Sequence, residues 1–474
     1  MNNVLKKVLA LSLASILTMS AITSCSKTQE LLTFIGSEAA GTDFEGYNLK
    51  ILDMVSETGY TFLEYKENTA IYDALLQHIE SIEKEKNCII TFTPSSHKKI
   101  SDIVAMAAAD NLNADAIFGG HSDVKELARG GVSLSANEFQ NIVDIKNFEK
   151  YGTPSVQEVN SYKGNIIALS PLSWPTIQPS SIDLLIFNMD NISRYGKAAP
   201  QEHLENDAWN WKALETVISD YYVQDPENPI YSLTCRSFDL LRLLCFGNGV
   251  SMTYKDVDGM VKSGFGTPEM MEAIDFYNKL STENDEKFAI KPDIDPSWDD
   301  LINSFAKSQN SMVCLITPAL LYSTIAYDVG NYSVMPFPTG PNGEYGIWPS
   351  VLEGISGFAV LKSCYDSENA FKVIDLICNP IKGYETKDLR LDYLMENIFY
   401  NRSDAEIATT AYQNGTYSYW ADTIGSSRTD DLWRELALNY TQSASEILSK
   451  NEKMFNSLIT EYMTPNLKIH EFFN

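Results

Sequence analysis

The sequence predicts an α/β protein of two lobes, and two observations carry this prediction. At 474 residues the chain is too long for one ordinary hydrophobic core, so two domains or two lobes are expected. Its folded part opens with segments that alternate between the apolar pattern of a strand and that of an amphipathic helix. Such alternation indicates a mostly parallel sheet with helices on its faces, and ligands bind such sheets beyond the carboxyl ends of the strands.

The N-terminus has the pattern of a bacterial lipoprotein signal. Two lysines precede an apolar run at 8–19, and Ile22-Thr23-Ser24-Cys25 matches the lipobox at which such signals are processed. We therefore expect a signal peptide at 1–24 and acyl chains on Cys25, which would hold the protein at the extracytoplasmic face of the cell membrane. The alternative is an ordinary secretory peptide with an incidental cysteine. Residues 25–46 lack periodicity and predict a flexible tether.

The first folded segments follow the order β-α-β-α-β. Strands are expected at 48–55, 88–93 and 114–118, and amphipathic helices at 71–82 and 100–108. The chain therefore predicts a parallel sheet at the start of its first lobe.

The loop after the third strand, Gly119-Gly120-His121-Ser122-Asp123, lies where a ligand would bind such a sheet. His121 and Asp123 are its candidate ligand contacts. The alternative is that Asp123 or Ser122 caps the helix that follows from Val124, a role that needs no ligand.

A tryptophan stands in the loop at 170–181, after a predicted strand at 162–169. Trp174 has no helical or strand partners in the pattern, and its flat ring offers a large apolar area with little entropy to lose. It is therefore a candidate stacking platform. The alternative is an indole folded onto its own loop, against Pro171 and Pro179.

The next segments predict a second lobe. A strand at 183–189 is the first crossing between lobes, and the helix that Asn210-Trp211 opens is expected to bury Trp211. Arg236-Ser237-Phe238-Asp239 stands at the head of an apolar helix at 240–246. Thr267-Pro268 then starts another helix, because proline is favoured at the first helical position.

A buried run, two strands and a glycine-rich segment follow. The run at 311–316 and a strand at 333–337 lead to a Pro/Gly turn at 338–343. Gly354-Ile355-Ser356-Gly357 predicts backbone that approaches a neighbour closely, and a strand at 358–361 follows it. The rest of the chain is helical in pattern. Asp366 or Ser367 is expected to cap the first of these helices, and Trp420 lies in an aromatic loop further on.

The order of these segments resembles the extracellular solute-binding proteins of ABC importers, in the carbohydrate-binding family that includes maltose-binding protein. In that family a helix and an F…G-K-…M turn precede a strand, an MP-x-P-x-GP-x-G segment crosses between the lobes, and a Gly-rich strand with ligand contacts returns. Here 305–312, 335–343 and 354–361 fill those places. Where several sugar binders carry a stacking tryptophan, this chain has Ala319 and Leu320.

The resemblance implies a periplasmic-binding-protein-like fold, with two lobes, crossing hinge segments and a ligand cleft between them. The first lobe is then expected at 47–187 plus 338–378, and the second at 188–337 plus 379–474. The implied function is a lipid-anchored, monomeric solute-binding protein that captures a carbohydrate, with an oligosaccharide as the expected class. It would deliver this ligand to the permease subunits of an ABC transporter, with no enzymatic activity and no cofactor.

Both aromatic and polar side chains are expected to contact the sugar, because flat rings stack on sugar faces and polar groups bond to hydroxyls. The residues in a position to supply these contacts are His121, Asp123, Trp174, Arg236, Phe238, Asp239, Trp348 and Glu353. Several have alternatives. Phe238 fits a core position, Arg236 and Asp239 fit a local ion pair, Trp348 fits a Trp-Pro turn, and Glu353 fits a solvated surface.

Composition excludes some classes of function. A formal charge of −27 argues against nucleic-acid binding, because phosphate recognition depends on clustered lysine and arginine. Cys25 apart, six cysteines remain, most of them in apolar runs, so buried thiols are favoured over disulfides. The five histidines show no metal-ligand spacing and there is no C-x-x-C pair, so no metal site is expected.

Other functions remain as alternatives. An exported glycoside hydrolase would need two carboxylates at a defined separation, which sequence does not show, and no G-x-S-x-G, H-E-x-x-H or phosphate loop is present. A surface glycan-binding lipoprotein of helical-repeat type is disfavoured by the β-α-β start. The same fold binding a non-sugar solute such as a peptide stays open.

Overall fold

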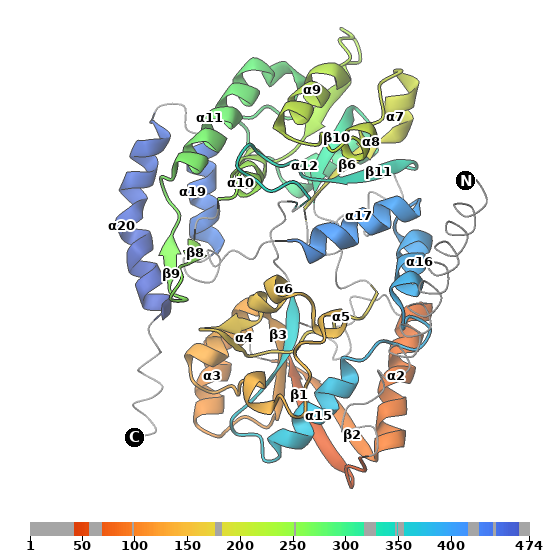
Figure 1. Ribbon diagram of the computed structural model, residues 1–474, viewed down its shortest axis with the longest axis vertical. Helices are drawn as coiled ribbons and strands as arrows, with labels where there is room; N and C mark the ends of the chain where they lie inside the picture. Colours follow the sequence, from red (N-terminus) through yellow and green to blue (C-terminus); the bar gives the residue numbers. More distant parts are fainter. Residues whose placement is uncertain are drawn as a thin grey trace, which may run out of the picture.

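A computed structural model describes residues 42–55, 69–96, 99–175, 183–250, 253–316, 329–346, 348, 355–415, 426–438 and 442–463. The chain forms two α/β lobes, one above the other in Figure 1, each built on a four-stranded sheet. Predictions that concern the signal peptide, Cys25, most of the tether, Ala319, Leu320, Glu353 and Trp420 lie outside the described residues.

The first sheet has the strand order β12-β3-β1-β2. Its strands are β1 (Tyr47–Asp53), β2 (Cys88–Pro94), β3 (Ala116–Gly120) and β12 (Ser356–Val360). β1 pairs in parallel with both β2 and β3, which confirms the parallel start predicted from the alternating pattern. β12 arrives from far along the chain and adds an antiparallel edge beside β3.

Helices and a short hairpin surround this sheet. They are α2 (Ala70–Lys86), α3 (Ile100–Ala108), α4 (His121–Arg129), α5 (Phe148–Tyr151), α6 (Pro154–Val159), α15 (Ser367–Ile377) and the pair β4 (Ser161–Tyr162) and β5 (Asn165–Ile166). α2 shows why these segments are helical. The side chain of Thr69 caps its first turn, and the apolar residues Ile71, Leu75, Ile79 and Ile82 recur at helical spacing on its buried face.

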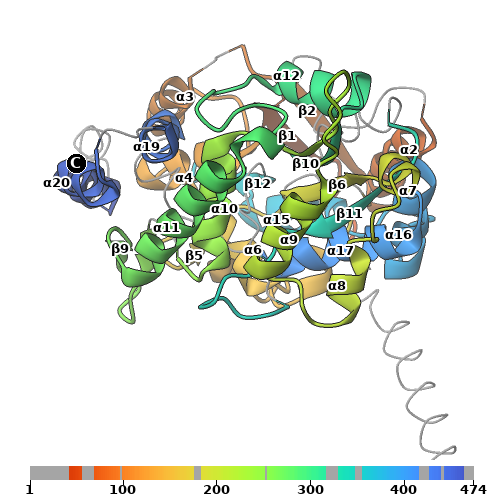
Figure 2. The same ribbon diagram turned by 90° about the horizontal axis from the view of Figure 1, so that it is seen from above.

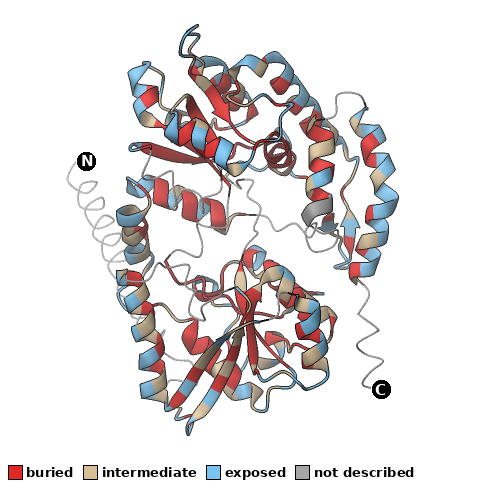
Figure 3. Ribbon diagram, turned by 180° about the vertical axis from the view of Figure 1, so that it is seen from behind, coloured by how far each residue is buried: buried red, intermediate tan, exposed pale blue. Residues whose placement is uncertain are grey.

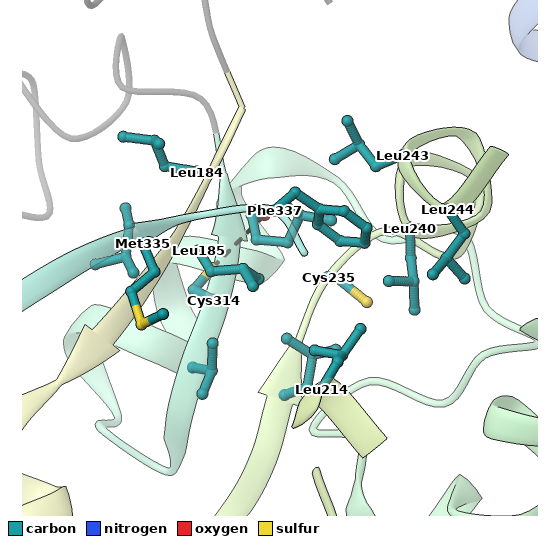
Figure 4. Close-up of a cluster of buried hydrophobic side chains, with 14 of the residues drawn as sticks. Leu184, Leu185, Leu214, Cys235, Leu240, Leu243, Leu244, Cys314, Met335 and Phe337 are labelled. Carbon is teal, nitrogen blue, oxygen red and sulfur yellow. Dashed lines mark hydrogen bonds between the residues drawn. The ribbon is translucent and has the colours of Figure 1, made fainter. Parts of the chain in front are cut away.

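The second sheet has the order β11-β6-β10-β7. Its strands are β6 (Leu184–Asn188), β7 (Tyr231–Thr234), β10 (Ser311–Ile316) and β11 (Tyr332–Pro336). β6 runs antiparallel to both of its neighbours, while β10 and β7 are parallel. Figure 4 shows the apolar side chains between this sheet and its helices, among them Leu185, Cys314 and Leu240.

The second sheet is packed by helices from two parts of the chain. The first set is α7 (Met189–Arg194), α8 (Gln201–Glu205), α9 (Trp211–Tyr221), α10 (Ser237–Gly247), α11 (Pro268–Glu283) and α12 (Trp298–Ile302), with the hairpin β8 (Thr253–Lys255) and β9 (Val261–Ser263). The C-terminal set is α16 (Lys387–Asn397), α17 (Arg402–Gln413), α19 (Ser426–Leu438) and α20 (Ala444–Met463). α16 and α20 lie on opposite sides of the molecule in both views (Figures 1 and 2).

β6 and β11 of the second sheet are fully buried, and β3 and β12 of the first sheet are buried over most of their length, as the red strands in Figure 3 show. β1 and β2 instead combine buried residues with intermediate or exposed ones. Trp211 is also buried, stacked on Phe276 with 4.5 Å between ring centroids, so its predicted core position is confirmed. All six described cysteines are free thiols. Five are buried, as predicted, and Cys364 is half-buried. None of the described helices combines the length and apolar character that a membrane crossing requires.

The glycine-rich segments do not lie quite as the sequence predicted. Gly119 and Gly120 belong to β3 rather than to the loop after it, because they pair with Gly357 and Ser356 of β12. Gly357 does approach a neighbour closely, as expected. A Cβ atom there would stand 3.0 Å from both Ala168 Cβ and the Ser170 hydroxyl, so a larger residue would push these segments apart.

Candidate functional site

The chain topology identifies two sheet edges between which the chain crosses from lobe to lobe. In the first lobe, β3 ends at Gly120 beside Ser356, where β12 begins after the chain has returned from the second lobe. In the second lobe, β6 begins at Leu184, directly after the first crossing, and Leu184 pairs with Ile316 at the end of β10. We call these the interlobe edges. Ligands of open α/β sheets bind at such carboxyl ends.

His121 and Asp123 stand at the first interlobe edge, in the first turn of α4. Both are half-buried. The backbone N–H of His121 donates to the carbonyl of Ile355 at 2.9 Å, which fixes the start of α4 beside the returning segment. Burial raises the pKa of the Asp123 carboxyl, while a hydrogen bond from the backbone of Gly120 opposes the rise. Neither Asp123 nor Ser122 is the N-cap of α4, because Gly120 holds that position and no side chain caps it. Asp123 instead supports the helix start from within the first turn, and His121 keeps a half-exposed side chain at this edge.

Trp174 does not have the exposed face that a stacking platform needs. Its side chain is 0% exposed and belongs to the apolar core of the first lobe. The indole N–H donates to the carbonyl of Asn379 at 3.2 Å, which joins the loop to the segment after α15. Trp174 is therefore a packing residue and not a ligand contact. Burying so large an apolar ring among apolar neighbours is more favourable than leaving it exposed to water.

A chain of alternating charges lies at the second interlobe edge, where β7 leads into α10. Arg236 Nε donates to Asp239 Oδ2 at 2.6 Å. The other carboxylate oxygen of Asp239 lies 3.1 Å from Arg242 Nη2, an ion-pair distance without hydrogen-bond alignment. Arg242 Nη2 is in turn 3.5 Å from the carboxylate of Asp183, just before β6. Arg236 and Asp239 therefore do form the local ion pair that was their alternative.

Asp183 is the least stabilised charge of this cluster. Burial raises the pKa of its carboxyl to about 6, against the opposing effect of Arg242. Nearby Asp239 raises it further, because two negative charges repel each other. The raised pKa belongs to a carboxyl at the place where the chain enters the second lobe.

Phe238 also lacks an exposed face. It is 2% exposed, and the guanidinium groups of Arg236 and Arg434 lie 4.5 Å and 4.7 Å from its ring centroid. Two cations close to one ring are favourable, because the face of an aromatic ring is electron-rich. Phe238 is thus a core residue that positions the two arginines, which corrects its proposed stacking role.

Trp298 is the aromatic residue at this edge that the sequence did not single out. It begins α12 and is half-buried, and the guanidinium carbon of Arg236 lies 3.8 Å from its ring. Neither terminal nitrogen of Arg236 has a hydrogen-bond partner within the described part of the chain. Trp298 shares α12 with the buried residues Leu301 and Ile302, so its local pattern indicates a core face. Its contact with a residue 62 positions earlier is not visible in any local pattern.

Trp348 is almost fully buried. It is 8% exposed and meets Tyr345 edge to face, with 5.1 Å between ring centroids. Its apolar neighbours belong to the core of the second lobe, so its ring lacks the exposed face that stacking on a sugar needs. The alternative of a Trp-Pro turn involves Pro349, which lies outside the described residues. Glu353, its predicted companion, lies outside the described residues.

Five of the predicted site residues fall into two groups, while Trp174 and Trp348 are buried elsewhere. His121 and Asp123 share the first turn of α4, and Arg236, Phe238 and Asp239 share the start of α10, where Trp298 joins them. Within the described ranges, no group of three or more histidine, cysteine or acidic side chains is placed to hold a metal ion. The half-exposed side chains of both groups can offer hydrogen bonds and one aromatic ring to a polar ligand.

Comparison with known proteins gives structural neighbours but no sequence relatives. No protein-family model matches the chain, and no curated protein matches it either. The ABC substrate-binding protein Lmo0181 of Listeria monocytogenes, solved in complex with cycloalternan, is 15% identical with a TM-score of 0.58, over 88% of this chain and 99% of that one.

Two further neighbours cover as much of the chain. The sugar-binding protein MalE of Xanthomonas citri is 13% identical with a TM-score of 0.60, over 87% of this chain and 98% of that one. A cyclo/maltodextrin-binding protein, complexed with maltotetraose, is 14% identical with a TM-score of 0.60, over 88% and 98%. The chain has two α/β lobes with crossings at the interlobe edges, and it agrees with each neighbour over nearly that neighbour's full length. We conclude that this chain has the fold of the sugar-binding proteins of ABC transporters.

Proposed function

We propose that this protein captures a carbohydrate, with an oligosaccharide as the expected class, and delivers it to the permease of an ABC transporter. The observation that carries the proposal is the shared two-lobed fold over 87% or more of the chain, with neighbours whose solved ligands include cycloalternan and maltotetraose. These neighbours are binding proteins, which favours capture over hydrolysis. The proposal therefore contains no catalytic step and no cofactor.

The position of the protein in the cell belongs to the same proposal. A lipid anchor on Cys25 would keep the lobes at the extracytoplasmic face of the membrane, next to the permease, because more than one acyl chain is needed for stable anchoring. The part of the predicted tether at 26–41 would let the two lobes reach the transporter. Residues 42–46, predicted as tether, instead join the first lobe, where Phe44 is buried in the apolar core.

The ligand is proposed to contact both interlobe edges. His121 and Asp123 would supply polar contacts from the first lobe, and Arg236, Asp239 and Trp298 would supply contacts from the second. A ligand that touches both lobes favours the arrangement in which both sets of contacts are made, and this differential affinity is what drives lobe closure.

The proposal is tested by a titration of the chain from residue 26 onward. Both sheets and all described helices lie after residue 41, so this chain carries the whole described fold. Tryptophan fluorescence is followed against linear and cyclic oligosaccharides, amino acids and short peptides. We expect a saturable response to one class of oligosaccharide. A response to peptides or amino acids alone would keep the fold and overturn the carbohydrate assignment.

Two substitutions then locate the site. Arg236→Gln and Trp298→Ala should each weaken oligosaccharide binding by about tenfold, which corresponds to about 1.4 kcal/mol and to the loss of one good polar or aromatic contact. Isothermal titration calorimetry measures both, since Trp298→Ala also removes a fluorophore. Arg402→Gln is the matched control, because Arg402 lies on α17 in exposed ion pairs with Asp388, Asp392 and Glu406. Unchanged affinity in both site variants would move the site away from α10 and α12.

A further inference from the structure

The C-terminal helix α20 packs in the cores of both lobes. It packs against β9, and its residues Phe455 and Ile459 join the apolar core of the second lobe. One turn later Tyr462, which is 5% exposed, joins an apolar cluster of the first lobe that contains Leu127 and Tyr162. In Figure 1, α20 and β9 lie at the left edge of the molecule, and α20 reaches down toward the level of α4. A single helix thus connects the two lobes away from the crossing segments.

Tyr462 makes three contacts with the first lobe. The hydroxyl of Tyr162 donates to the backbone carbonyl of Tyr462 at 3.1 Å. The two rings meet edge to face, with centroids 5.6 Å apart and planes at 84°. The guanidinium of Arg129, at the end of α4, lies 5.9 Å from the centroid of Tyr462. Edge-to-face packing and a cation over the ring are both favourable geometries for tyrosine.

An ion pair joins the same parts of the two lobes. Lys255 of β8 contacts the carboxylate of Glu158 at the end of α6. Glu158 precedes Tyr162 by one short turn, and β8 pairs with β9, the strand on which α20 packs. The two contacts therefore belong to one interlobe patch. We call it the α20 clasp, formed by Arg129, Glu158 and Tyr162 of the first lobe and by Lys255 and Tyr462 of the second.

We propose that the α20 clasp holds the two lobes together independently of any ligand, and so sets the fraction of molecules in this lobe arrangement. The clasp contacts exist only while the lobes keep this separation, so each contact favours this arrangement over more open ones. Their loss removes one set of interlobe contacts and shifts the population toward open forms. The clasp lies outside the proposed ligand contacts, since none of its five residues is among them.

Small-angle X-ray scattering of the ligand-free chain from residue 26 onward tests the proposal. Tyr462→Ala should increase the radius of gyration, because it removes both ring contacts. Tyr254→Ala is the matched control. Tyr254 lies on the same hairpin as Lys255, is exposed, and belongs to no described clasp contact, so its loss should leave the radius of gyration at the wild-type value.

A charge reversal gives a second test that does not depend on a buried tyrosine. Glu158→Lys places two positive charges opposite each other and should also increase the radius of gyration. The double variant Glu158→Lys/Lys255→Glu restores an attractive pair and should return the value toward wild type. If Tyr462→Ala does not fold, as judged by circular dichroism, the scattering of the two charge variants alone tests the proposal.

The proposal is overturned if folded Tyr462→Ala and Glu158→Lys both scatter like the wild type. It is also overturned if Tyr462→Ala does not fold and Glu158→Lys scatters like the wild type. No ligand enters these measurements, so their failure leaves the proposed carbohydrate binding untouched, and a failed ligand titration leaves the clasp untouched.

Discussion

Trp174 is held on all sides by the first-lobe core and by one hydrogen bond from its indole to the carbonyl of Asn379. Replacing a buried tryptophan by alanine removes its apolar contacts and leaves a cavity. We therefore expect Trp174→Ala to lower the free energy of unfolding by about 3–5 kcal/mol. Urea unfolding followed by far-ultraviolet circular dichroism measures this loss.

The control for this prediction is Trp174→Phe, which keeps an aromatic ring and should cost less than the alanine variant. A different outcome would change the role of the residue. If Trp174→Ala unfolds like the wild type and loses affinity for oligosaccharides, Trp174 would be a ligand contact after all.

The charged residues at the second interlobe edge show what single residues contribute there. Asp239 is bonded to Arg236 and close to Arg242, so its carboxylate is held in place before any ligand arrives. The guanidinium of Arg236 is fixed at Nε and lies over Trp298, while its terminal nitrogens point to no described partner. A cation held in this way loses little side-chain entropy when it binds a hydroxyl, which favours affinity.

At the scale of elements, α17 is joined to β11 by one buried carboxylate. Asp404 accepts a hydrogen bond from the Ser333 hydroxyl at 2.7 Å and another from the Asn401 side chain at 3.0 Å. Burial nevertheless raises its pKa to about 6, because these hydrogen bonds only partly offset the loss of water.

This pKa gives a pH dependence of known sign. The folded protein binds the Asp404 proton more tightly than the unfolded chain, whose carboxyl titrates near 4. The stabilisation is complete below about pH 4 and is lost as pH rises through about 6. The free energy of unfolding of the wild type, relative to that of Asp404→Asn, should therefore fall between pH 4 and 6. The fall amounts to about 1.4 kcal/mol for each unit of pKa shift, and the difference then levels off.

Urea unfolding at several pH values checks this dependence. Asp220→Asn is the control, since Asp220 is an exposed residue of α9. The difference in free energy of unfolding between this variant and the wild type should change far less over the same pH range. Parallel curves for the wild type and Asp404→Asn would show that Asp404 titrates alike in both states, and would contradict the prediction.

Several helix boundaries were accessible from the sequence because caps act locally. Asp366 caps α15 by accepting from the backbone N–H of Asn369, and Pro268 stands in the first turn of α11, both as predicted. α4 begins at His121, three residues earlier than expected from its apolar pattern. The reason is tertiary. The backbone of His121 bonds to Ile355, a partner that no local pattern contains.

At the scale of the whole molecule, the proposed lipid anchor would hold the two lobes at the membrane. In a bacterial host we expect the full chain in the membrane fraction and the variant Cys25→Ser in the soluble fraction, since each buried methylene of an acyl chain contributes about 0.8 kcal/mol to membrane binding. Fractionation followed by immunoblotting measures this. Cys364→Ser, a change at a half-buried thiol far from the N-terminus, should stay in the membrane fraction. Equal membrane fractions for the full chain and Cys25→Ser would show that Cys25 is not the anchor.

The two lobes are connected by more than the crossing segments. α6 belongs to the first part of the chain, yet Val156 and Val159 pack in the core of the second lobe, and Tyr462 of α20 packs in the first. The lobe boundaries expected from the sequence remain a prediction. Because each of these side chains packs in the core of the other lobe, a lobe boundary placed at a single residue separates the two cores only approximately.

The sequence by itself determined the alternation of strands and helices in the first lobe, the two-lobed α/β fold class, the starts of α9, α11 and α15 and the burial of most cysteines. All of these depend on apolar period and on neighbours a few residues apart, which a linear pattern records. Only the tertiary structure decided that Trp174, Phe238 and Trp348 are packed, that Trp298 lies under Arg236, and that α20 joins both lobes. Whether these side chains are exposed depends on contacts with segments tens to hundreds of residues away, such as the contact of Trp174 with Asn379 and that of Tyr162 with Tyr462. Such long-range packing leaves no periodic pattern in the sequence.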